Sequence, residues 1–177
     1  IEAIQALGVE LVVSGCPGCV RTLKNVYPRL AMKPSFEVMH TSELFNRYFD
    51  EGRLKVENKA VMKVAYHDPC ELARLYGVVD EPRRLLNEGV RGFIELPENK
   101  HDVRCCGGGG VLQAVNDELR LKMGMRRVQQ ALALDAELLT SACPACKITL
   151  IDSAKKLGGK ISAIDVNELI AKQLNLL

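Results

Sequence analysis

The chain has 177 residues, with 24 Lys and Arg against 22 Asp and Glu, and 47% of its residues are hydrophobic. This composition is typical of a globular protein that buries a core, and it excludes disordered, fibrous and low-complexity classes. The net charge of +2 is close to neutral, whereas nucleic-acid-binding proteins usually carry a clear excess of basic residues, so we expect no nucleic-acid partner. The longest uncharged run, residues 105–116, is too short for a transmembrane segment, and no signal peptide is predicted at the start.

The first fifty residues are predicted to contain two strands, each followed by a helix. A short helical pattern precedes them and ends at Gly8, a residue type that favours helix ends. The expected elements are a strand at 10–13, a helix from Pro17 to about Leu30, a strand at 36–39 and a helix at 42–49. Residues 50–59 are charged and contain glycine, so they are the best candidate for a linker.

The remaining residues continue the alternation of strands and helices. The expected strands are 61–66, 92–96, 138–141 and 161–164; the expected helices begin at Asp68, Pro82, Val111, Pro144 and Asp165. Asp68 and Glu71 fit the two ends of a capping box, as do Asp165 and Glu168. The helix from Val111 is expected to run without a break to about Leu134.

This alternation predicts an α/β fold with a mainly parallel sheet flanked by helices, similar to a Rossmann arrangement. Right-handed crossovers place the carboxyl ends of parallel strands at one edge of the sheet. Every cysteine follows the end of a predicted strand. We therefore expect the cysteines to converge at that edge, where α/β proteins place their functional sites.

Seven cysteines are the most informative feature of the sequence. They are Cys16, Cys19, Cys70, Cys105, Cys106, Cys143 and Cys146. An odd number in a chain of this length argues against a framework of disulfide bonds. Two Cys-x-x-Cys pairs and one adjacent pair instead indicate metal or iron–sulfur ligands, although one or two of these cysteines could be ordinary buried residues.

An internal repeat surrounds the two Cys-Pro-x-Cys sequences. Residues 9–23 and 136–150 are identical at eight of fifteen aligned positions. Only the second copy is preceded by further cysteines, and the chain begins with Ile1 inside a helical pattern. We therefore expect a C-terminal portion of a longer protein, with the tail of a first domain in residues 1–58 and a complete second domain in residues 59–177.

The local sequence around these cysteines favours thiolates. Pro144 fits the first position of a helix, which places Cys143 at the N-cap and Cys146 at the third position, near free N–H groups. Cys16 and Cys19 repeat this pattern, and Cys70 is expected near another helix start. The positive end of a helix dipole lowers the pKa of a thiol, and the thiolate is the form that binds metal.

Glycines follow the adjacent cysteine pair in an unbroken run, residues 107–110. Without side chains, these residues would let backbone N–H groups approach the negatively charged sulfurs of Cys105 and Cys106. The alternatives are a simple flexible turn and a phosphate-binding loop. The phosphate loop is disfavoured, because the spacing of the glycines and the expected preceding strand are missing.

The cysteine spacing resembles that of the cysteine-rich CCG domain family. The pattern is Cys70-x34-Cys105-Cys106-x36-Cys143-x2-Cys146, with Tyr66-His67-Asp68-Pro69 before it and four glycines after Cys106. The family includes one of the subunits of heterodisulfide reductase and the iron–sulfur subunits of systems that oxidise glycolate, lactate or glycerol-3-phosphate. The similarity covers about residues 60–177, together with the end of a first repeat.

The resemblance implies a site and a function. Cys70, Cys105, Cys106, Cys143 and Cys146 would bind one non-cubane [4Fe–4S] cluster, which an aerobic preparation can lose. Cys16 and Cys19 would be the last two metal ligands of a first, incomplete site. The chain would be part of an oxidoreductase subunit, of the heterodisulfide reductase type or the type that oxidises 2-hydroxy acids or glycerol-3-phosphate. Relatives often carry His at the position of Glu71, so a role for that His does not transfer here.

The implied partners are other subunits of an oxidoreductase, namely a flavoprotein, a ferredoxin-like iron–sulfur subunit, or both. We expect a cytoplasmic location, with any contact to a membrane surface made through such a partner. Two alternatives stay open from the residues themselves. One is a structural zinc domain that uses four of the cysteines, and the other is a cluster-free dithiol protein in which Cys143 and Cys146 cycle with a disulfide.

The remaining polar residues give weaker predictions. His67 is expected to stabilise the turn at the end of its strand, with a hydrogen bond to the cluster as the alternative. His40 and His101 are expected at the surface. The charged residues Arg120, Lys122, Arg126 and Arg127 are expected to form a solvated helix face.

Overall fold

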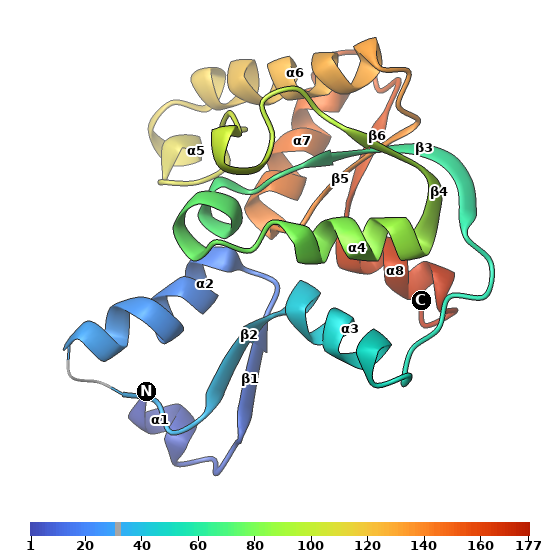
Figure 1. Cartoon of the computed structure of the whole chain (residues 1–177). Coiled ribbons are helices and arrows are strands. Elements are labelled where there is room, and N and C mark those ends of the chain that lie inside the picture. The colour runs from blue at the N-terminus through green and yellow to red at the C-terminus, as the bar shows by residue number, and fades with distance from the viewer. Residues whose placement is uncertain (31–32) are drawn as a thin grey trace.

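A computed structural model describes residues 1–30 and 33–177. Its strands form two parallel sheets, and helices connect the strands along the chain (Figure 1). A two-stranded sheet contains β1 (Leu11–Ser14) and β2 (Glu37–His40). A four-stranded sheet has the order β4-β3-β5-β6, formed by Val90–Glu95, Ala60–His67, Leu138–Ser141 and Ser162–Asp165. All of these strand pairs are parallel, which confirms the predicted α/β class.

Helices connect the strands in chain order. The α-helices are α1 (Glu2–Gln5), α2 (Pro17–Arg21), α3 (Thr41–Asp50), α4 (Asp80–Gly89), α5 (Leu112–Val115), α6 (Asp117–Ala133), α7 (Pro144–Lys156) and α8 (Val166–Gln173). Two π-helical segments, η1 (Thr22–Val26) and η3 (Glu71–Tyr76), and two 3₁₀ segments, η2 (Tyr27–Leu30) and η4 (Lys100–Asp102), complete the set. Within the described residues, none of the helices combines the length and the apolar character that crossing a membrane requires.

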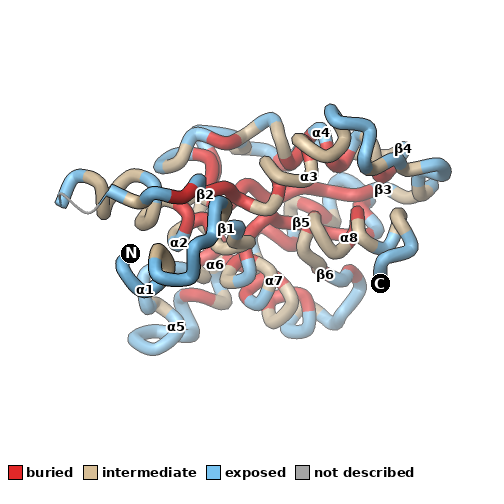
Figure 2. The backbone as a smooth tube through the Cα atoms, turned by 90° about the horizontal axis from the view of Figure 1, so that it is seen from below, coloured by how far each residue is buried: buried red, intermediate tan, exposed pale blue. Residues whose placement is uncertain are grey.

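The four-stranded sheet lies between two layers of helices (Figure 1). Ala65 and Leu139 pack in one apolar cluster with residues of α6 and α7, whereas Val64 and Leu138 pack in another with residues of α4 and α8. Neighbouring residues of a strand point to opposite faces, so a strand covered on both sides needs apolar residues at successive positions, as Val64-Ala65 and Leu138-Leu139 provide. Figure 2 shows that the buried segments concentrate at β3 and β5, while α1 and α5 are largely exposed.

Two segments of the chain have the same order of elements and the same register. They are β1-α2-β2-α3 and β5-α7-β6-α8. Ser14 pairs with His40 at the end of the first strand pair, and Ser141 pairs with Asp165 at the end of the second. Both α3 and α8 begin with a capping box, which confirms the predicted cap at Asp165. The repeat in the sequence is therefore a repeat of structure.

His40 was predicted at the surface, and this prediction is wrong. Its side chain is fully buried and forms the N-cap of α3, where Nδ1 accepts a hydrogen bond from the backbone N–H of Ser42 at 3.2 Å. Its Nε2 lies 3.2 Å from the carbonyl oxygen of Gly15. The imidazole thus occupies the position that the Asp165 carboxylate has in the second copy.

Two predicted helices are interrupted. The helix expected from Pro17 to Leu30 ends at Arg21, and the chain continues as η1 and η2. The helix expected from Val111 to Leu134 is divided at Asn116, whose side chain accepts a hydrogen bond from the backbone N–H of Leu119 at 3.0 Å. Asn116 acts as the N-cap of α6, a role that Asn side chains favour and that overrides continuous helical spacing.

The capping box predicted at Asp68 and Glu71 does not form. Both carboxylate oxygens of Asp68 accept hydrogen bonds from Arg83, each at 2.8 Å, and Asp68 is 1% exposed. Arg83 also donates to Glu95 at 2.6 Å. Glu71 instead accepts from Arg21 at 2.7 Å, so it links η3 to α2. A bidentate arginine is a stronger partner for a buried carboxylate than the helix N–H groups are.

Candidate metal centre

Five cysteines lie at the carboxyl edge of the four-stranded sheet. Cys70 follows β3 at the start of η3, Cys105 and Cys106 follow β4 through η4, and Cys143 and Cys146 follow β5 at the start of α7. The strands are parallel, so their carboxyl ends share an edge, as the sequence predicted. Three segments that are far apart in the sequence thereby supply sulfur atoms to one place.

The five sulfur atoms form a connected series. Cys105 interacts through side-chain hydrogen bonds with Cys70 and Cys106, and Cys106 interacts in turn with Cys146. Cys146 also donates to Cys143. A ring nitrogen of His67 and the sulfur atoms of Cys106 and Cys146 lie within 4.8 Å of one another. The structure therefore brings together all five cysteines that the CCG-type spacing singled out.

In these contacts Cys105 and Cys143 accept, Cys70 and Cys146 donate, and Cys106 does both. Hydrogen bonding from Cys106, with a further contribution from Cys70, lowers the pKa of Cys105. Hydrogen bonding from Cys146 lowers the pKa of Cys143 to about 7, and the backbone N–H groups of Cys146 and Ala145 add to this effect. Each donor thiol has a raised pKa for the same reason. A group of neighbouring sulfurs that retain protons in this way can release them to a metal cation.

The helix start at Cys143 matches the sequence prediction. Cys143 is the N-cap of α7, and Pro144 occupies its first turn. Cys16 is likewise the N-cap of α2, followed by Pro17. The expected lowering of the pKa at every helix-start cysteine is not found, because hydrogen bonding to neighbouring sulfurs raises the pKa of Cys19, Cys70 and Cys146.

The glycine run packs directly on the sulfur atoms. The backbone N–H of Gly107 donates to Cys105 Sγ at 3.3 Å, and that of Gly108 donates to Cys106 Sγ at 3.4 Å. Gly107 has a φ of +89°, a conformation that other residues rarely adopt. A Cβ atom on Gly108 would lie 2.5 Å from the carbonyl oxygen of Ala145. The absence of side chains therefore allows this loop to approach the start of α7.

His67 and Arg127 form a buried polar pair beside the sulfur atoms. Both side chains are 0% exposed, and Arg127 Nε donates to His67 Nδ1 at 3.2 Å. An arginine side chain only donates, so Nδ1 is the accepting nitrogen and Nε2 carries the proton. Burial, followed by the nearby positive charge of Arg127, lowers the pKa of His67 to about 3 and keeps the ring neutral. Within the described residues, the ring bonds to Arg127 of α6 and not to the turn after β3, so the predicted stabilisation of that turn is not found.

Each side chain of this pair has a nitrogen atom whose hydrogen-bonding capacity is unused. Within the part of the chain that the structure describes, His67 Nε2 and Arg127 Nη2 have no hydrogen-bond partner. Burial of Arg127 was not predicted, because it and its charged neighbours were expected to form a solvated face. That prediction is wrong for Arg120 as well, which is 3% exposed and donates to Asp117 and Asp152. His101 is exposed, as predicted.

Cys16 and Cys19 form a second, separate pair. Cys19 is exposed, Cys16 is half-buried, and the two interact through a side-chain hydrogen bond that raises the pKa of Cys19. Cys143 is near enough for its charge to contribute to that shift. The structure therefore places this pair next to the five-cysteine group but not within its series of contacts.

The donor set fits an iron–sulfur cluster. Three of the five cysteines, Cys106, Cys143 and Cys146, are at most 8% exposed, whereas Cys70 and Cys105 are half-buried. Tetrahedral zinc takes four ligands and would leave one of five adjacent sulfurs unused. Clusters of several iron atoms take cysteine thiolates at more than one metal, and N–H groups directed at sulfur stabilise them.

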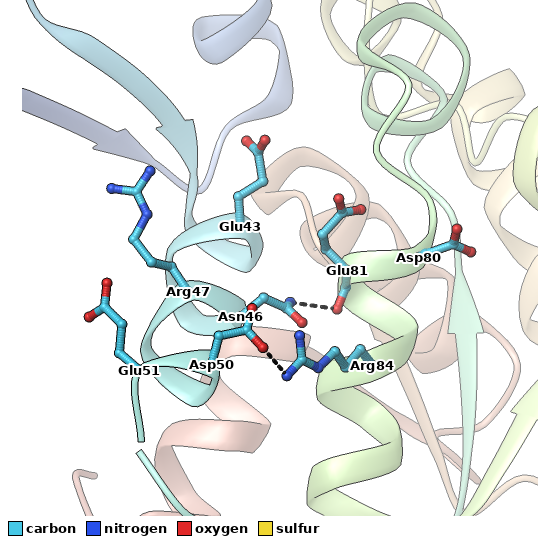
Figure 3. A pocket seen from close by; sticks show the side chains of 8 residues that line it. All are labelled: Glu43, Asn46, Arg47, Asp50, Glu51, Asp80, Glu81 and Arg84. Atoms are coloured by element: carbon cyan, nitrogen blue, oxygen red, sulfur yellow. Dashed lines mark hydrogen bonds and ion pairs between the residues drawn. The ribbon is translucent and has the colours of Figure 1, made fainter. Parts of the chain in front are cut away.

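A cavity of about 660 Å³ lies apart from the cysteines, between α3 and α4 (Figure 3). Charged residues line it, and its groups are partly paired: Arg84 Nη2 donates to Asp50 at 2.6 Å, and Asn46 Nδ2 donates to the carbonyl oxygen of Glu81 at 2.9 Å. Within the described chain, the metal-binding side chains whose ligand atoms converge are instead His67, Cys106 and Cys146. We therefore assign the candidate centre to the cysteines.

Comparisons with known proteins agree with this assignment. Residues 64–151 match the family described as CCG, the cysteine-rich domain. Over 99% of its length, the chain is 38% identical to one of the subunits of the dihydromethanophenazine:CoB–CoM heterodisulfide reductase of Methanosarcina barkeri. It is 32% identical over 92% of its length to one of the subunits of the fumarate reductase (CoM/CoB) of Methanothermobacter marburgensis, and 32% identical over 98% to the EtfAB:quinone oxidoreductase of Syntrophomonas wolfei.

The chain spans less than half of each of these relatives. It corresponds to 44% of the M. barkeri protein, 32% of the M. marburgensis protein and 25% of the S. wolfei protein. The similarity therefore concerns a shared portion of larger oxidoreductase proteins.

Proposed function

Because residues 64–151 belong to the cysteine-rich CCG domain family, we propose that the chain is part of an iron–sulfur oxidoreductase subunit of the heterodisulfide reductase type. In this proposal Cys70, Cys105, Cys106, Cys143 and Cys146 together bind one cluster, a non-cubane [4Fe–4S] centre, through which electrons pass. The observation that carries the proposal is the connected series of these five sulfur atoms from three segments of the chain.

When bound, an iron–sulfur cluster supplies a centre that accepts and releases single electrons. The protein's part is to hold and adjust that centre. The five thiols release their protons and bind as thiolates, while the N–H groups of Gly107 and Gly108 donate toward Cys105 and Cys106 and stabilise negative charge there. His67 is kept neutral by burial, and one of its ring nitrogens lies within 4.8 Å of the sulfur atoms of Cys106 and Cys146.

The surroundings of the site favour exchange of electrons on one side. Cys106 and Cys146 are buried against the sheet and α7, so water has little access there. Cys70 and Cys105 are half-buried and lie toward the surface. An electron donor or acceptor would therefore approach from the side of Cys70 and Cys105.

The proposal extends to the domain organisation of the chain. Residues 59–177 would form a complete CCG domain, and residues 1–58 would form the tail of a preceding one. The shared order, register and capping boxes of β1-α2-β2-α3 and β5-α7-β6-α8 support it. Cys16 and Cys19 occupy the positions of Cys143 and Cys146 in this arrangement, so we propose that they are ligands of a neighbouring centre.

We also propose that the chain works with other oxidoreductase subunits, a flavoprotein, a ferredoxin-like iron–sulfur subunit or both. The name of the M. barkeri relative assigns it to a CoB–CoM heterodisulfide reductase, and that of the S. wolfei relative assigns it to an EtfAB:quinone oxidoreductase. Relatives with such different acceptors support a shared role in moving electrons. A cytoplasmic location and contact with a membrane through a partner stay predictions.

The experiment is metal and sulfide analysis of protein produced anaerobically with added iron, together with visible and EPR spectra. We expect iron and acid-labile sulfide in equal amounts, a brown protein and an EPR signal that responds to reduction or oxidation. Zinc without iron would instead identify a structural zinc domain. Colourless protein without either metal, carrying a reducible bond between Cys143 and Cys146, would identify a dithiol protein. Both results contradict the proposal.

A further inference from the structure

The cavity between α3 and α4, about 660 Å³ in volume, has a negatively charged wall (Figure 3). Five of its lining residues are carboxylates: Glu43, Asp50, Glu51, Asp80 and Glu81. The two arginines of the lining are already paired, Arg84 with Asp50 and Arg47 with Glu37 outside the cavity. Glu51 and Asp80 pair with the exposed cations Arg53 and Lys100, which also lie outside the lining. Glu43 and Glu81 remain to be compensated.

These two carboxylates have no cationic partner among residues 1–30 and 33–177. Glu43 accepts hydrogen bonds from the backbone N–H of His40 and from the hydroxyl of Tyr76, each at 2.8 Å, and both donors are neutral. The nearby Lys24 donates to the Tyr76 hydroxyl at 2.7 Å and not to the carboxylate. Glu81 contributes its carbonyl oxygen to a hydrogen bond, while its carboxylate lines the cavity without an ion pair. The cavity therefore carries negative charge on both its α3 and its α4 wall.

Asn46 gives independent evidence for a ligand that donates hydrogen bonds. Its side chain extends from α3 toward α4 in the cavity lining, and the residue is 6% exposed (Figure 3). Nδ2 donates to the carbonyl oxygens of Ser42 at 2.7 Å and of Glu81 at 2.9 Å. These two acceptors fix the orientation of the amide, because the flipped form would place Oδ1 against both of them. Within the described chain, no donor meets Oδ1. A buried acceptor without a partner is costly, so this oxygen indicates an N–H-bearing ligand.

The arrangement favours an organic cation over a metal ion. Calcium and magnesium require several oxygen ligands that converge at about 2.0–2.6 Å from the ion. In the part of the chain that the structure describes, the convergent metal-binding side chains are those beside the cysteine centre, and the carboxylates of this cavity are not among them. An ammonium group instead carries three N–H donors that can meet acceptors spread over a wider wall. The volume of the cavity is also typical of a small-molecule site.

We propose that this cavity binds a small alkylamine through its ammonium groups. The ammonium group donates to Asn46 Oδ1, and the carboxylates of Glu81 and Glu43 compensate the positive charge of the ligand. Since α3 (Thr41–Asp50) and α4 (Asp80–Gly89) lie on opposite sides of the proposed domain boundary after residue 58, the ligand would join the two parts of the chain. Binding at this cavity requires no iron, so it is a property separate from electron transfer.

The test measures binding to the 177-residue chain by isothermal titration calorimetry at low, constant ionic strength. The first probe is butane-1,4-diamine, and the second is its permethylated analogue, which has the same charge but no N–H group. We expect the analogue to bind about tenfold more weakly, because it cannot donate to Asn46. Glu81→Gln should weaken binding of the diamine about tenfold as well. Glu88→Gln is the matched control on the same helix, outside the lining, and should leave the affinity unchanged.

Three outcomes overturn the inference. The diamine fails to bind saturably to the unaltered protein, the permethylated analogue binds as tightly as the diamine, or Glu81→Gln binds as tightly as Glu88→Gln. Magnesium chloride is the third probe, and magnesium that binds while the diamine does not contradicts an amine site. The comparison of the two amines uses the unaltered protein, so it stands even where a variant is unstable. Iron is measured in the same samples: iron-loaded protein that binds no diamine contradicts this inference alone, and iron-free protein that binds it contradicts the proposed function alone.

Discussion

Gly108 lies where an added side chain would collide with the backbone of α7. An alanine Cβ at this position would lie 2.5 Å from the carbonyl oxygen of Ala145 and 2.9 Å from its carbonyl carbon. Contacts of this kind ordinarily begin at 3.4 Å, so the loop and the start of α7 must separate by about 0.9 Å. Ala145 belongs to the backbone of the helix that holds Cys143 and Cys146, and it cannot rotate away as a side chain could.

The expected cost of Gly108→Ala follows from this geometry. Forcing an additional methyl group into a packed region destabilises a protein by about 1–3 kcal/mol. For a chain of this size, each kcal/mol lowers the melting temperature by about 2–4 °C. The separation also moves Cys105 and Cys106 away from Cys143 and Cys146, so we expect a lower iron content after anaerobic loading as well as a lower free energy of unfolding.

Gly109→Ala is the matched control. In the described chain nothing lies within 4 Å of a Cβ at Gly109, and its φ lies outside the left-handed region. Replacing this glycine should leave the folded loop unstrained and restrict the unfolded chain, with a change of about 0.5 kcal/mol or less, or a slight stabilisation. Urea denaturation and iron analysis of both variants test the prediction. Equal stability and equal iron content in the two variants would refute the close contact between the loop and α7.

Two further predictions concern buried polar groups. Arg83→Met should lower the free energy of unfolding, measured in urea, by about 3–5 kcal/mol. The reason is that the Asp68 carboxylate, which is 1% exposed, loses its bidentate partner. A loss below about 1 kcal/mol would contradict this. Burial holds the pKa of His40 below its usual 6.5, so below that pH the unfolded chain binds the extra proton and stability falls. In His40→Gln, the decrease in stability between neutral and acidic pH should be less steep by up to about 1.4 kcal/mol per pH unit, and an unchanged slope would argue against the burial of His40.

Much of the fold follows from local sequence. The segment 138–141 forms a strand with the predicted bounds, and proline after cysteine places Cys143 at the N-cap of α7. These features depend on neighbouring residues alone. The convergence of the cysteines at one edge also followed, because parallel strands with helical crossovers leave little freedom in where their ends lie.

The errors arise where distant residues override local patterns. Asp68 has the spacing of a helix cap, but Arg83, fifteen positions later, takes its carboxylate. Arg127 has charged neighbours in the sequence, yet it is buried because His67 and the carbonyl oxygen of Pro97 meet it from other elements. Single-sequence reasoning cannot identify such partners.

The most direct test of the central claim is the iron content of Cys70→Ser, measured beside Cys19→Ser in the 177-residue chain after anaerobic loading. Cys70 belongs to the connected series of five sulfur atoms, whereas Cys19 lies outside it. We expect Cys70→Ser to lose most of its iron and its EPR signal. Cys19→Ser should retain both, because residues 1–58 contain only Cys16 and Cys19 and cannot complete the neighbouring centre by themselves. Full iron content with an unchanged spectrum in Cys70→Ser would contradict a single centre held by the five cysteines.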